Sequence, residues 1–152
     1  LRALKDLPNL AIITVHAAAG VAGIQRAKEE AKKLSTSPKI IAVTLLTSMD
    51  KEALAEIGVK SLKRQVLQLA GTAKKAGADG VVCSAKELKI LRQEFGESLE
   101  YIIPGIRPKG AETGDQARIV TPQAAKKLGA SYIVVGRPIT ETEKPEKAAQ
   151  AI

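Results

Sequence analysis

Polar and charged side chains follow the short apolar runs of this sequence, at the places where the runs end. These residues are His16, Thr47, Ser48, Arg107 and Arg137, the last of which directly follows Gly136. In parallel α/β proteins the carboxyl ends of the strands carry the site, and barrels often bind phosphate through the loops after the last two strands. Here those two loops contain Arg107 and Arg137. The pattern therefore indicates a phosphate-binding site at one edge of a parallel sheet.

Five apolar runs, apolar nearly throughout, are candidates for the strands that position this site. They cover residues 10–16, 39–46, 80–83, 101–103 and 132–135. Such runs are typical of parallel strands covered on both faces. Helical spacing of apolar residues predicts helices over 21–34, 61–76, 85–95, 123–128 and 145–152. Thr121 and Pro122 form a good helix start, an N-cap followed by proline at the first helical position.

An internal repeat relates residues 74–82 to residues 126–134. Each copy predicts a helix end, a glycine, a short turn and a buried strand, so the chain uses one helix-to-strand joint twice. An open doubly wound sheet and a (β/α)₈ TIM barrel both fit this α/β alternation. No Gly-x-Gly-x-x-Gly follows the first strand and no Walker loop is present, which favours the barrel.

Composition excludes several classes of protein. Three aromatic residues in 152 cannot build the stacking platforms of a single-strand nucleic-acid groove. The single cysteine, Cys83, rules out an intramolecular disulfide and a cysteine-based zinc site. No apolar run approaches the length of a membrane span. The net charge of +8 suits an anionic partner, but most lysines are mixed with glutamates along helices, as on a solvated surface. We therefore expect neither a nucleic acid nor a membrane as partner.

Six segments together resemble the orotidine 5′-monophosphate decarboxylase family. They are residues 15–20, 41–48, 79–84, 104–107, 115–118 and 134–140, in the order and with the spacing of that family. The resemblance covers about residues 10–152. It implies a (β/α)₈ barrel and a lyase of pyrimidine biosynthesis that converts orotidine monophosphate (OMP) to uridine monophosphate (UMP) and CO₂. It also implies a cytoplasmic homodimer and a reaction without metal or organic cofactor.

The resemblance assigns ligand contacts to two of the strand ends. Thr47 corresponds to the residue that contacts the pyrimidine ring, with Ser48 beside it. Gly136 and Arg137 correspond to the phosphate site, where a backbone N–H and a guanidinium bind phosphate oxygens. The residues alone leave other roles open: Thr47 or Ser48 as the N-cap of a following helix, and Arg137 in a surface ion pair.

The resemblance also implies a mobile loop that closes over the ligand. Arg107 would begin this loop, and Gln116, in its middle, would bridge base and phosphate. Arg107 could instead pair with Glu112 or Asp115 and order the loop. His16 ends its strand facing the site, and we expect it to support the ligand-contacting residues from behind.

One signature of the family is missing from the 152 residues. The Asp-x-Lys-x-x-Asp motif, which carries the catalytic lysine and two carboxylates, does not occur. The chain corresponds to strands four to eight, so we expect one domain over 1–152, the C-terminal portion of a barrel without its first three units, inactive by itself. The alternatives are a related sugar-phosphate decarboxylase or aldolase-type barrel enzyme, and a non-catalytic partial-barrel module that binds phosphate.

Overall fold

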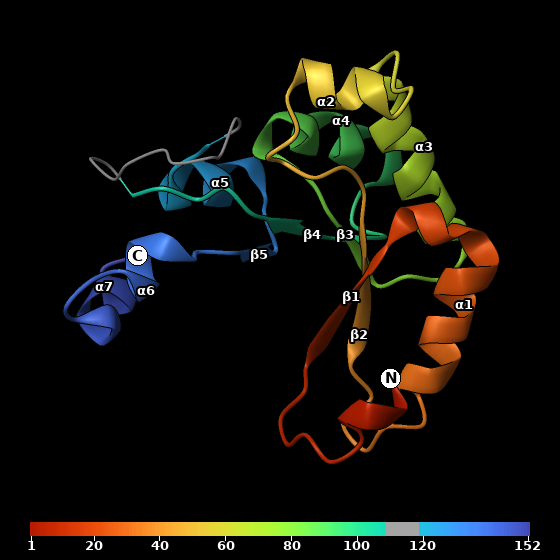
Figure 1. Cartoon of the computed structure of the whole chain (residues 1–152), viewed down its shortest axis with the longest axis horizontal. Coiled ribbons are helices and arrows are strands. Elements are labelled where there is room, and N and C mark those ends of the chain that lie inside the picture. Colours follow the sequence, from red (N-terminus) through yellow and green to blue (C-terminus); the bar gives the residue numbers. More distant parts are fainter. Residues whose placement is uncertain (109–118) are drawn as a thin grey trace.

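Five parallel strands form one sheet in the computed structural model, which describes residues 1–108 and 119–152 (Figure 1). The strands are β1 (Ile12–His16), β2 (Lys39–Val43), β3 (Gly80–Val82), β4 (Glu100–Ile103) and β5 (Tyr132–Ile133). They lie in the order β1-β2-β3-β4-β5, so each strand pairs with its neighbour in sequence. A doubly wound sheet reverses its strand order at a switch point. The sequential order is that of a barrel, as the sequence predicts.

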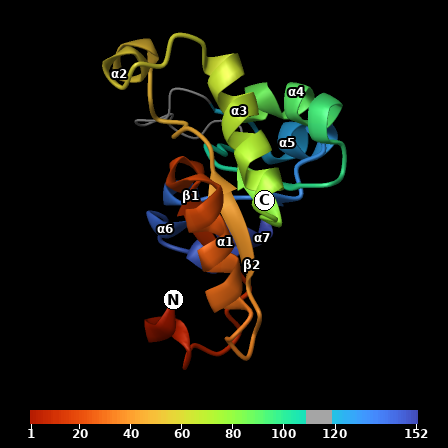
Figure 2. The same cartoon turned by 90° about the vertical axis from the view of Figure 1, so that its right-hand side faces the viewer.

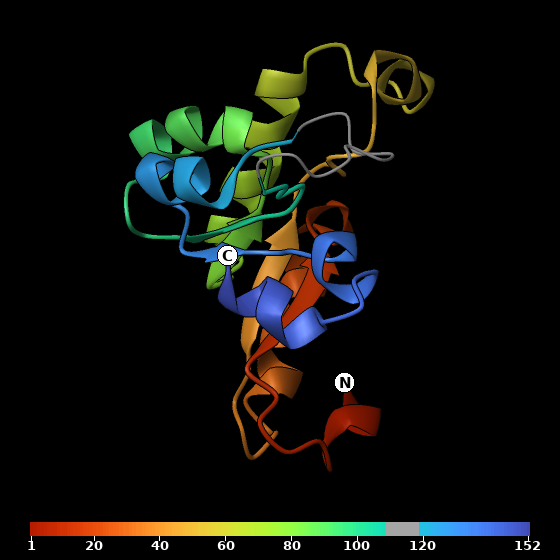
Figure 3. The ribbon, with the colours of Figure 1, turned by 90° about the vertical axis from the view of Figure 1, so that its left-hand side faces the viewer.

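Helices connect the strands and pack on one another around the outside of the sheet. They are α1 (Gly20–Ala31), α2 (Lys51–Glu56), α3 (Leu62–Lys75), α4 (Ala85–Phe95), α5 (Pro122–Leu128), α6 (Arg137–Thr140) and α7 (Pro145–Gln150), with 3₁₀ turns η1 (Arg2–Leu4) and η2 (Ala17–Ala19). Successive contacts join α1 to α3, α3 to α4 and α4 to α5. Figure 2 shows α1 and α3 covering β1 and β2, whereas α6 and α7 lie across the sheet from them (Figure 3).

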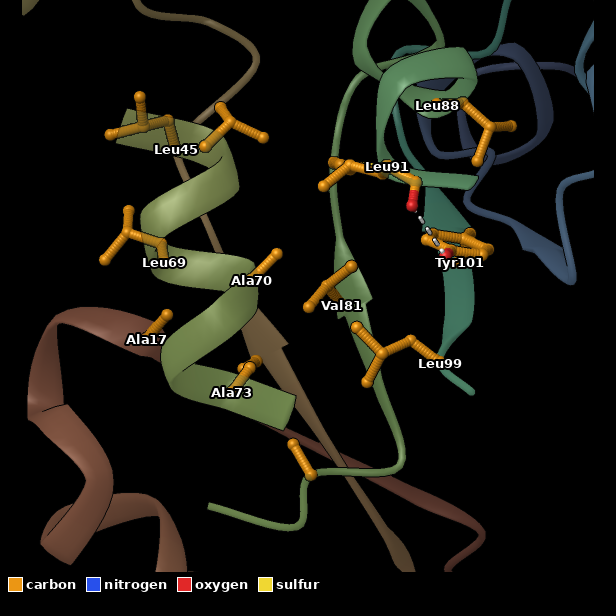
Figure 4. Packing of buried hydrophobic residues seen from close by; sticks show 14 of the residues in the cluster. Ala17, Leu45, Leu69, Ala70, Ala73, Val81, Leu88, Leu91, Leu99 and Tyr101 are labelled. Carbon is orange, nitrogen blue, oxygen red and sulfur yellow. Dashed lines mark hydrogen bonds between the residues drawn. The ribbon is translucent and has the colours of Figure 1, made fainter. Parts of the chain in front are cut away.

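The in-register pairing gives the sheet two different faces. Ile41 pairs with Thr14 and Gly80, and Gly80 pairs with Glu100, so these four share what we call the inner face. The alternate residues form the helix face and pack with the helices into one core. That core includes Ile40, Ala42, Val81, Cys83, Tyr101 and Ile103. Figure 4 shows part of it, between α3, β3 and α4. The helix face thus supplies the hydrophobic stabilisation of this chain.

In each copy of the internal repeat, the residue before the strand is hydrogen-bonded to the start of the neighbouring strand. Asp79 accepts a hydrogen bond from the N–H of Ile40 at 2.7 Å, and its own N–H donates to the Ile40 carbonyl at 2.9 Å. Ser131, at the matching repeat position, does the same with Tyr101, at 3.0 and 2.9 Å. Asp79 also pairs with Lys28 of α1 at 2.6 Å.

Helix starts follow the capping signals of the sequence. Thr121 accepts a hydrogen bond from the N–H of Ala124, which confirms the predicted start of α5. Ser84 and Glu87 form a reciprocal capping box at the start of α4. Both members of this box are buried, so it also satisfies polar groups that water cannot reach.

The elements differ from expectation at several points, among them the fifth strand, which ends at Ile133 and not at Val135. The second strand ends at Val43 and not at Leu46; directly after it, the N–H and the hydroxyl of Thr44 both donate to the Val82 carbonyl, at 3.2 and 2.8 Å. Leu45 is nevertheless buried, so its apolar side chain reflects its place in the core and not membership of a strand. The short helices α2 and α6 were not predicted, since six and four residues are too few to show a helical period.

Tyr101 gives a test of the core. Its ring is fully buried and its hydroxyl lies 2.8 Å from the Gly96 carbonyl and 3.3 Å from that of Leu91 (Figure 4). Tyr101→Phe removes the donor from these carbonyls and should lower the free energy of unfolding by about 1–3 kcal/mol. The matched control, Tyr132→Phe, alters a side chain that is 42% exposed and should cost within about 0.5 kcal/mol. Urea unfolding followed by circular dichroism measures both; equal losses would contradict this assignment.

Candidate functional site

The strand ends place the candidate residues along one edge of the sheet. His16 is the last residue of β1, and Thr47, Arg107 and Arg137 follow β2, β4 and β5. Because all five strands are parallel, these carboxyl ends lie at the same edge. His16 pairs in register with Val43, on the inner face, and its side chain is exposed. The structure therefore brings residues distant in sequence to one end of the fold.

Thr47 and Ser48 lie between β2 and α2 and do not cap that helix. The N-cap of α2 is Asp50, whose carboxylate accepts a hydrogen bond from the N–H of Ala53 at 2.9 Å. The capping role that the sequence left open for Thr47 or Ser48 thus belongs to Asp50. Thr47 is 7% exposed, whereas Ser48 is exposed to solvent.

Arg107 lies at the base of a long connection whose two ends are joined. Ile106 and Val120 form an isolated parallel bridge, in which the N–H of Arg107 donates to the Val120 carbonyl and that of Val120 to the Gly105 carbonyl. The Arg107 side chain is buried, and one guanidinium nitrogen donates to the Ile106 carbonyl at 2.9 Å. The chain therefore leaves and returns to the sheet edge at one fixed point. Gln116, Glu112 and Asp115 lie outside the described residues.

Gly136 and Arg137 lie where the chain passes from β5 into α6. Gly136 is the residue before the helix, and Arg137 is its first residue, exposed to solvent. A Cβ added at Gly136 would meet nothing within 4 Å, so packing does not explain this glycine. Glycine leaves the backbone open to close approach by a ligand. A backbone N–H beside an exposed guanidinium is suited to a phosphate.

Comparison with known proteins decides the family. The model of the orotidine 5′-phosphate decarboxylase / HUMPS family matches residues 5–152. This chain belongs to that family. An orotidine 5′-phosphate decarboxylase of Pseudoalteromonas atlantica is 46% identical over 93% of the chain and 62% of its own length. One of Mannheimia succiniciproducens is 43% identical over 99% of the chain and 66% of its own length.

Solved structures agree on the fold. The crystal structure of orotidine 5′-phosphate decarboxylase from Lactobacillus acidophilus matches with a TM-score of 0.78 and 40% identity, over 93% of this chain and 61% of that one. The Methanocaldococcus jannaschii enzyme, 23% identical, matches with a TM-score of 0.66 over 92% of this chain and 58% of that one. The five-strand sheet is thus part of a (β/α)₈ barrel, and the chain spans about three fifths of the length of these relatives.

The described part of the chain contains no cluster of side chains suited to a metal ion. Nowhere in residues 1–108 and 119–152 do three His, Cys, Asp or Glu gather closely enough to hold a metal ion. Every helix in the same part of the chain is too short or too polar to cross a bilayer.

Burial raises the pKa of the Cys83 thiol far above its usual range, so this thiol stays protonated and packs as a small apolar group.

Long-range ion pairs were missed by sequence reasoning. Two ion pairs join residues far apart in the sequence: Lys28 with Asp79, 51 positions apart, and Lys39 with Glu100, 61 positions apart. The spacing of residues along the chain does not reveal pairs at such separations. A signal did exist for Asp79, because the repeat placed it opposite Ser131 in the same joint.

The single cysteine allows a direct test of this environment. In the native chain at pH 8, Cys83 should react with an aromatic disulfide reagent roughly a hundred-fold more slowly than in guanidinium chloride, because the thiolate is the reactive form and burial suppresses it. Absorbance of the released thiolate follows the reaction. Equal rates in the native and unfolded chain would show that Cys83 is accessible and that the packing around it is wrong.

Proposed function

We propose that this chain provides the nucleotide-binding part of an orotidine 5′-phosphate decarboxylase, which converts OMP to UMP and CO₂. The observation that carries the proposal is the family match over residues 5–152, together with Thr47, Arg107 and Arg137 at one edge of the sheet. Relatives that carry this enzyme name are 42–46% identical to the chain.

The phosphate is bound, in this proposal, by Arg137 and the N–H of Gly136. Arg137 is the exposed cation at the carboxyl end of β5, beside a glycine that leaves the backbone open. Phosphate binding far from the reacting carbon supplies binding energy that orients the ring for reaction.

The pyrimidine is bound by Thr47 and Ser48. The low exposure of Thr47 gives its hydroxyl a defined position, and Ser48 adds a solvent-facing hydroxyl beside it. Arg107 fixes the base of the connection that carries Gln116, to which we assign the bridge between base and phosphate. His16, on the inner face at the end of β1, supports these residues from behind.

Proton transfer in this proposal depends on groups outside the 152 residues. The chain contains no Asp-x-Lys-x-x-Asp motif, so it supplies binding groups and not the lysine that protonates the product carbon. The complete enzyme is, in this proposal, a cytoplasmic homodimer that works without metal or organic cofactor.

Arg137 tests the phosphate assignment. Arg137→Ala should weaken UMP binding by roughly a hundred-fold, because a charge-assisted bidentate contact is lost, and should leave the weak binding of uridine unchanged. The matched control is Arg26→Ala, which removes an exposed arginine of α1 far along the chain from the strand end. Isothermal titration calorimetry measures both ligands. Equal losses for UMP and uridine, or a similar loss with Arg26→Ala, would contradict the assignment.

A competition experiment separates the decarboxylase from a sugar-phosphate enzyme of the same barrel type. Both would bind phosphate at Arg137, but only the decarboxylase needs Thr47 and Ser48 for a pyrimidine. UMP should displace a fluorescent nucleotide from the chain at concentrations at which a pentulose phosphate does not. Stronger displacement by the pentulose phosphate would favour the alternative enzyme.

The 152-residue chain by itself should show no decarboxylation above the uncatalysed rate. Its binding groups cannot replace the missing lysine and carboxylates, which the family uses to stabilise the transition state electrostatically. The assay follows the absorbance change from OMP to UMP, with protein produced in a host that lacks its own decarboxylase. Substantial turnover would show that other residues of this chain carry the chemistry.

A further inference from the structure

The two residues assigned to the pyrimidine lie at the tip of a β-turn. The N–H of Met49 donates to the Leu46 carbonyl at 3.2 Å, which closes a four-residue turn with Thr47 and Ser48 at its central positions. We call residues 46–49 the pyrimidine turn. Each residue that leads from a strand into a turn has two soft backbone dihedral angles, so a turn without an anchor can swing on its strand. The contacts that fix this turn to the sheet therefore matter for the ligand.

Thr44 bonds the chain to the sheet just before the pyrimidine turn. Its N–H and its hydroxyl both donate to the carbonyl of Val82, the last residue of β3, at 3.2 and 2.8 Å. A carbonyl oxygen has two lone pairs, so it can accept both bonds. Thr44 is only 4% exposed, and a hydrogen bond that is shielded from water is stronger than one in solvent. Thr44 is therefore a firm attachment of the chain to β3.

The chain changes direction directly after Thr44. The alternation of side chains along β2 would put Leu45 on the inner face, the face of Ile41 and Val43. Leu45 instead packs into the core of the helix face (Figure 4). Thr47 follows two residues later, no more than about 10 Å of chain from Thr44. The position of Thr47 is thus set over a short distance, from a residue that is bonded to β3.

The end of β3 is itself well supported. The N–H of Cys83, the residue after Val82, donates to the Ile102 carbonyl of β4 at 3.1 Å. The next residue is Ser84, whose buried capping box with Glu87 fixes the start of α4. The Val82 carbonyl therefore belongs to a part of the sheet that is held from both sides.

The far end of the pyrimidine turn has an anchor of a different kind. Asp50 is exposed, and its carboxylate accepts a hydrogen bond from the N–H of Ala53 within the short helix α2. This contact joins the far end of the turn to α2, whereas Thr44 joins the near end to the sheet.

We propose that Thr44 is a positioning residue for the pyrimidine turn: its hydroxyl, bonded to the Val82 carbonyl, sets the place of Thr47 and Ser48 relative to the phosphate-binding end of β5. The inference rests on the proposed function, which assigns the pyrimidine to Thr47 and Ser48. Thr44 acts through the turn and not by contact with the ligand. Groups that bind a ligand must be held within about 0.5 Å of the productive geometry, so a loosened turn loses affinity for the ring but not for the phosphate.

Thr44→Val removes the hydroxyl and keeps the shape of the side chain. The Val82 carbonyl retains the backbone N–H at position 44 as a donor, so no buried acceptor loses its last partner. The fold should therefore lose little stability, with a shift of the thermal unfolding midpoint of no more than about 3 °C. Circular dichroism measures this shift and shows that the variant folds.

Two ligands that differ by the pyrimidine test the positioning role. In Thr44→Val, UMP binding to the 152-residue chain should weaken about ten-fold, and ribose 5-phosphate binding by less than about two-fold, because the phosphate contact lies at β5. Thr44→Ser keeps the hydroxyl and should hold UMP within about three-fold of the unmodified chain. The matched control is Thr72→Val, which removes a hydroxyl bond to the Gln68 carbonyl in α3 and should change neither affinity. Titrations followed by NMR measure both ligands.

Hydrogen exchange tests the pyrimidine turn without a ligand. The Met49 amide should exchange about five-fold faster in Thr44→Val, because a turn that has lost an anchor opens more often. Its rate should stay as it is in Thr44→Ser and in Thr72→Val. An unchanged Met49 rate in Thr44→Val, or an equal loss of UMP and ribose 5-phosphate binding, would overturn the positioning role.

The binding experiment separates this inference from the proposed function. If the unmodified chain prefers UMP and Thr44→Val leaves that preference intact, the positioning role is overturned and the proposed function stands. Equal affinity of the unmodified chain for UMP and ribose 5-phosphate would contradict the proposed function. The exchange rate of Met49 would then still decide whether Thr44 fixes the turn.

Discussion

The parallel, in-register pairing of five strands in sequence order constrains everything else in this fold. Parallel strands need a crossover between them, and right-handed crossovers put the helices that connect the strands on the same side of a sequentially ordered sheet. One face is therefore packed against α1, α3, α4 and α5, and the other is left to close on itself as a barrel interior. The same direction of all strands also separates the two ends. The candidate site residues lie at the carboxyl ends, and Lys39, Glu100 and Tyr132 lie at the amino ends.

The start of each strand requires its own support, because a short strand has few ladder bonds to fix its register. β3 and β4 have three and four residues. Asp79 and Ser131 hold the second residues of β2 and β4, Ile40 and Tyr101, by a side-chain and a backbone hydrogen bond each. Asp79 adds the ammonium of Lys28 and so ties helix α1 to the sheet. The glycine that ends each preceding helix allows the turn that puts these side chains in place.

The sequence predicted the parts of the structure that depend on local pattern. Buried strands, the start of α5 at Thr121 and the repeated joint all leave apolar runs or capping residues in the sequence, and the structure confirms them. The end of β2 was misplaced because Leu45 is buried in a bend. Apolar residues occur both at buried positions in bends and in buried strands, so the sequence did not separate the two. The ion pair of Lys39 with Glu100 left no sequence signal, because both are ordinary charged residues until the sheet brings β2 and β4 to either side of Gly80 in β3. The polar residues after strands are at one edge of the sheet, as the sequence predicted, but no local pattern predicts their individual contacts.

The two ends of the strands are far enough apart for their side-chain contacts to be separate. A five-residue strand such as β2 is about 16 Å long, so Lys39 at its amino end is separated from the candidate site by about that distance. Lys39 and Glu100 interact by short-range contacts that do not reach Thr47 or Arg137 directly. The contacts at the amino ends of the strands and those at the candidate site are therefore separate within this chain, and a change at one end leaves the contacts of the other end in place.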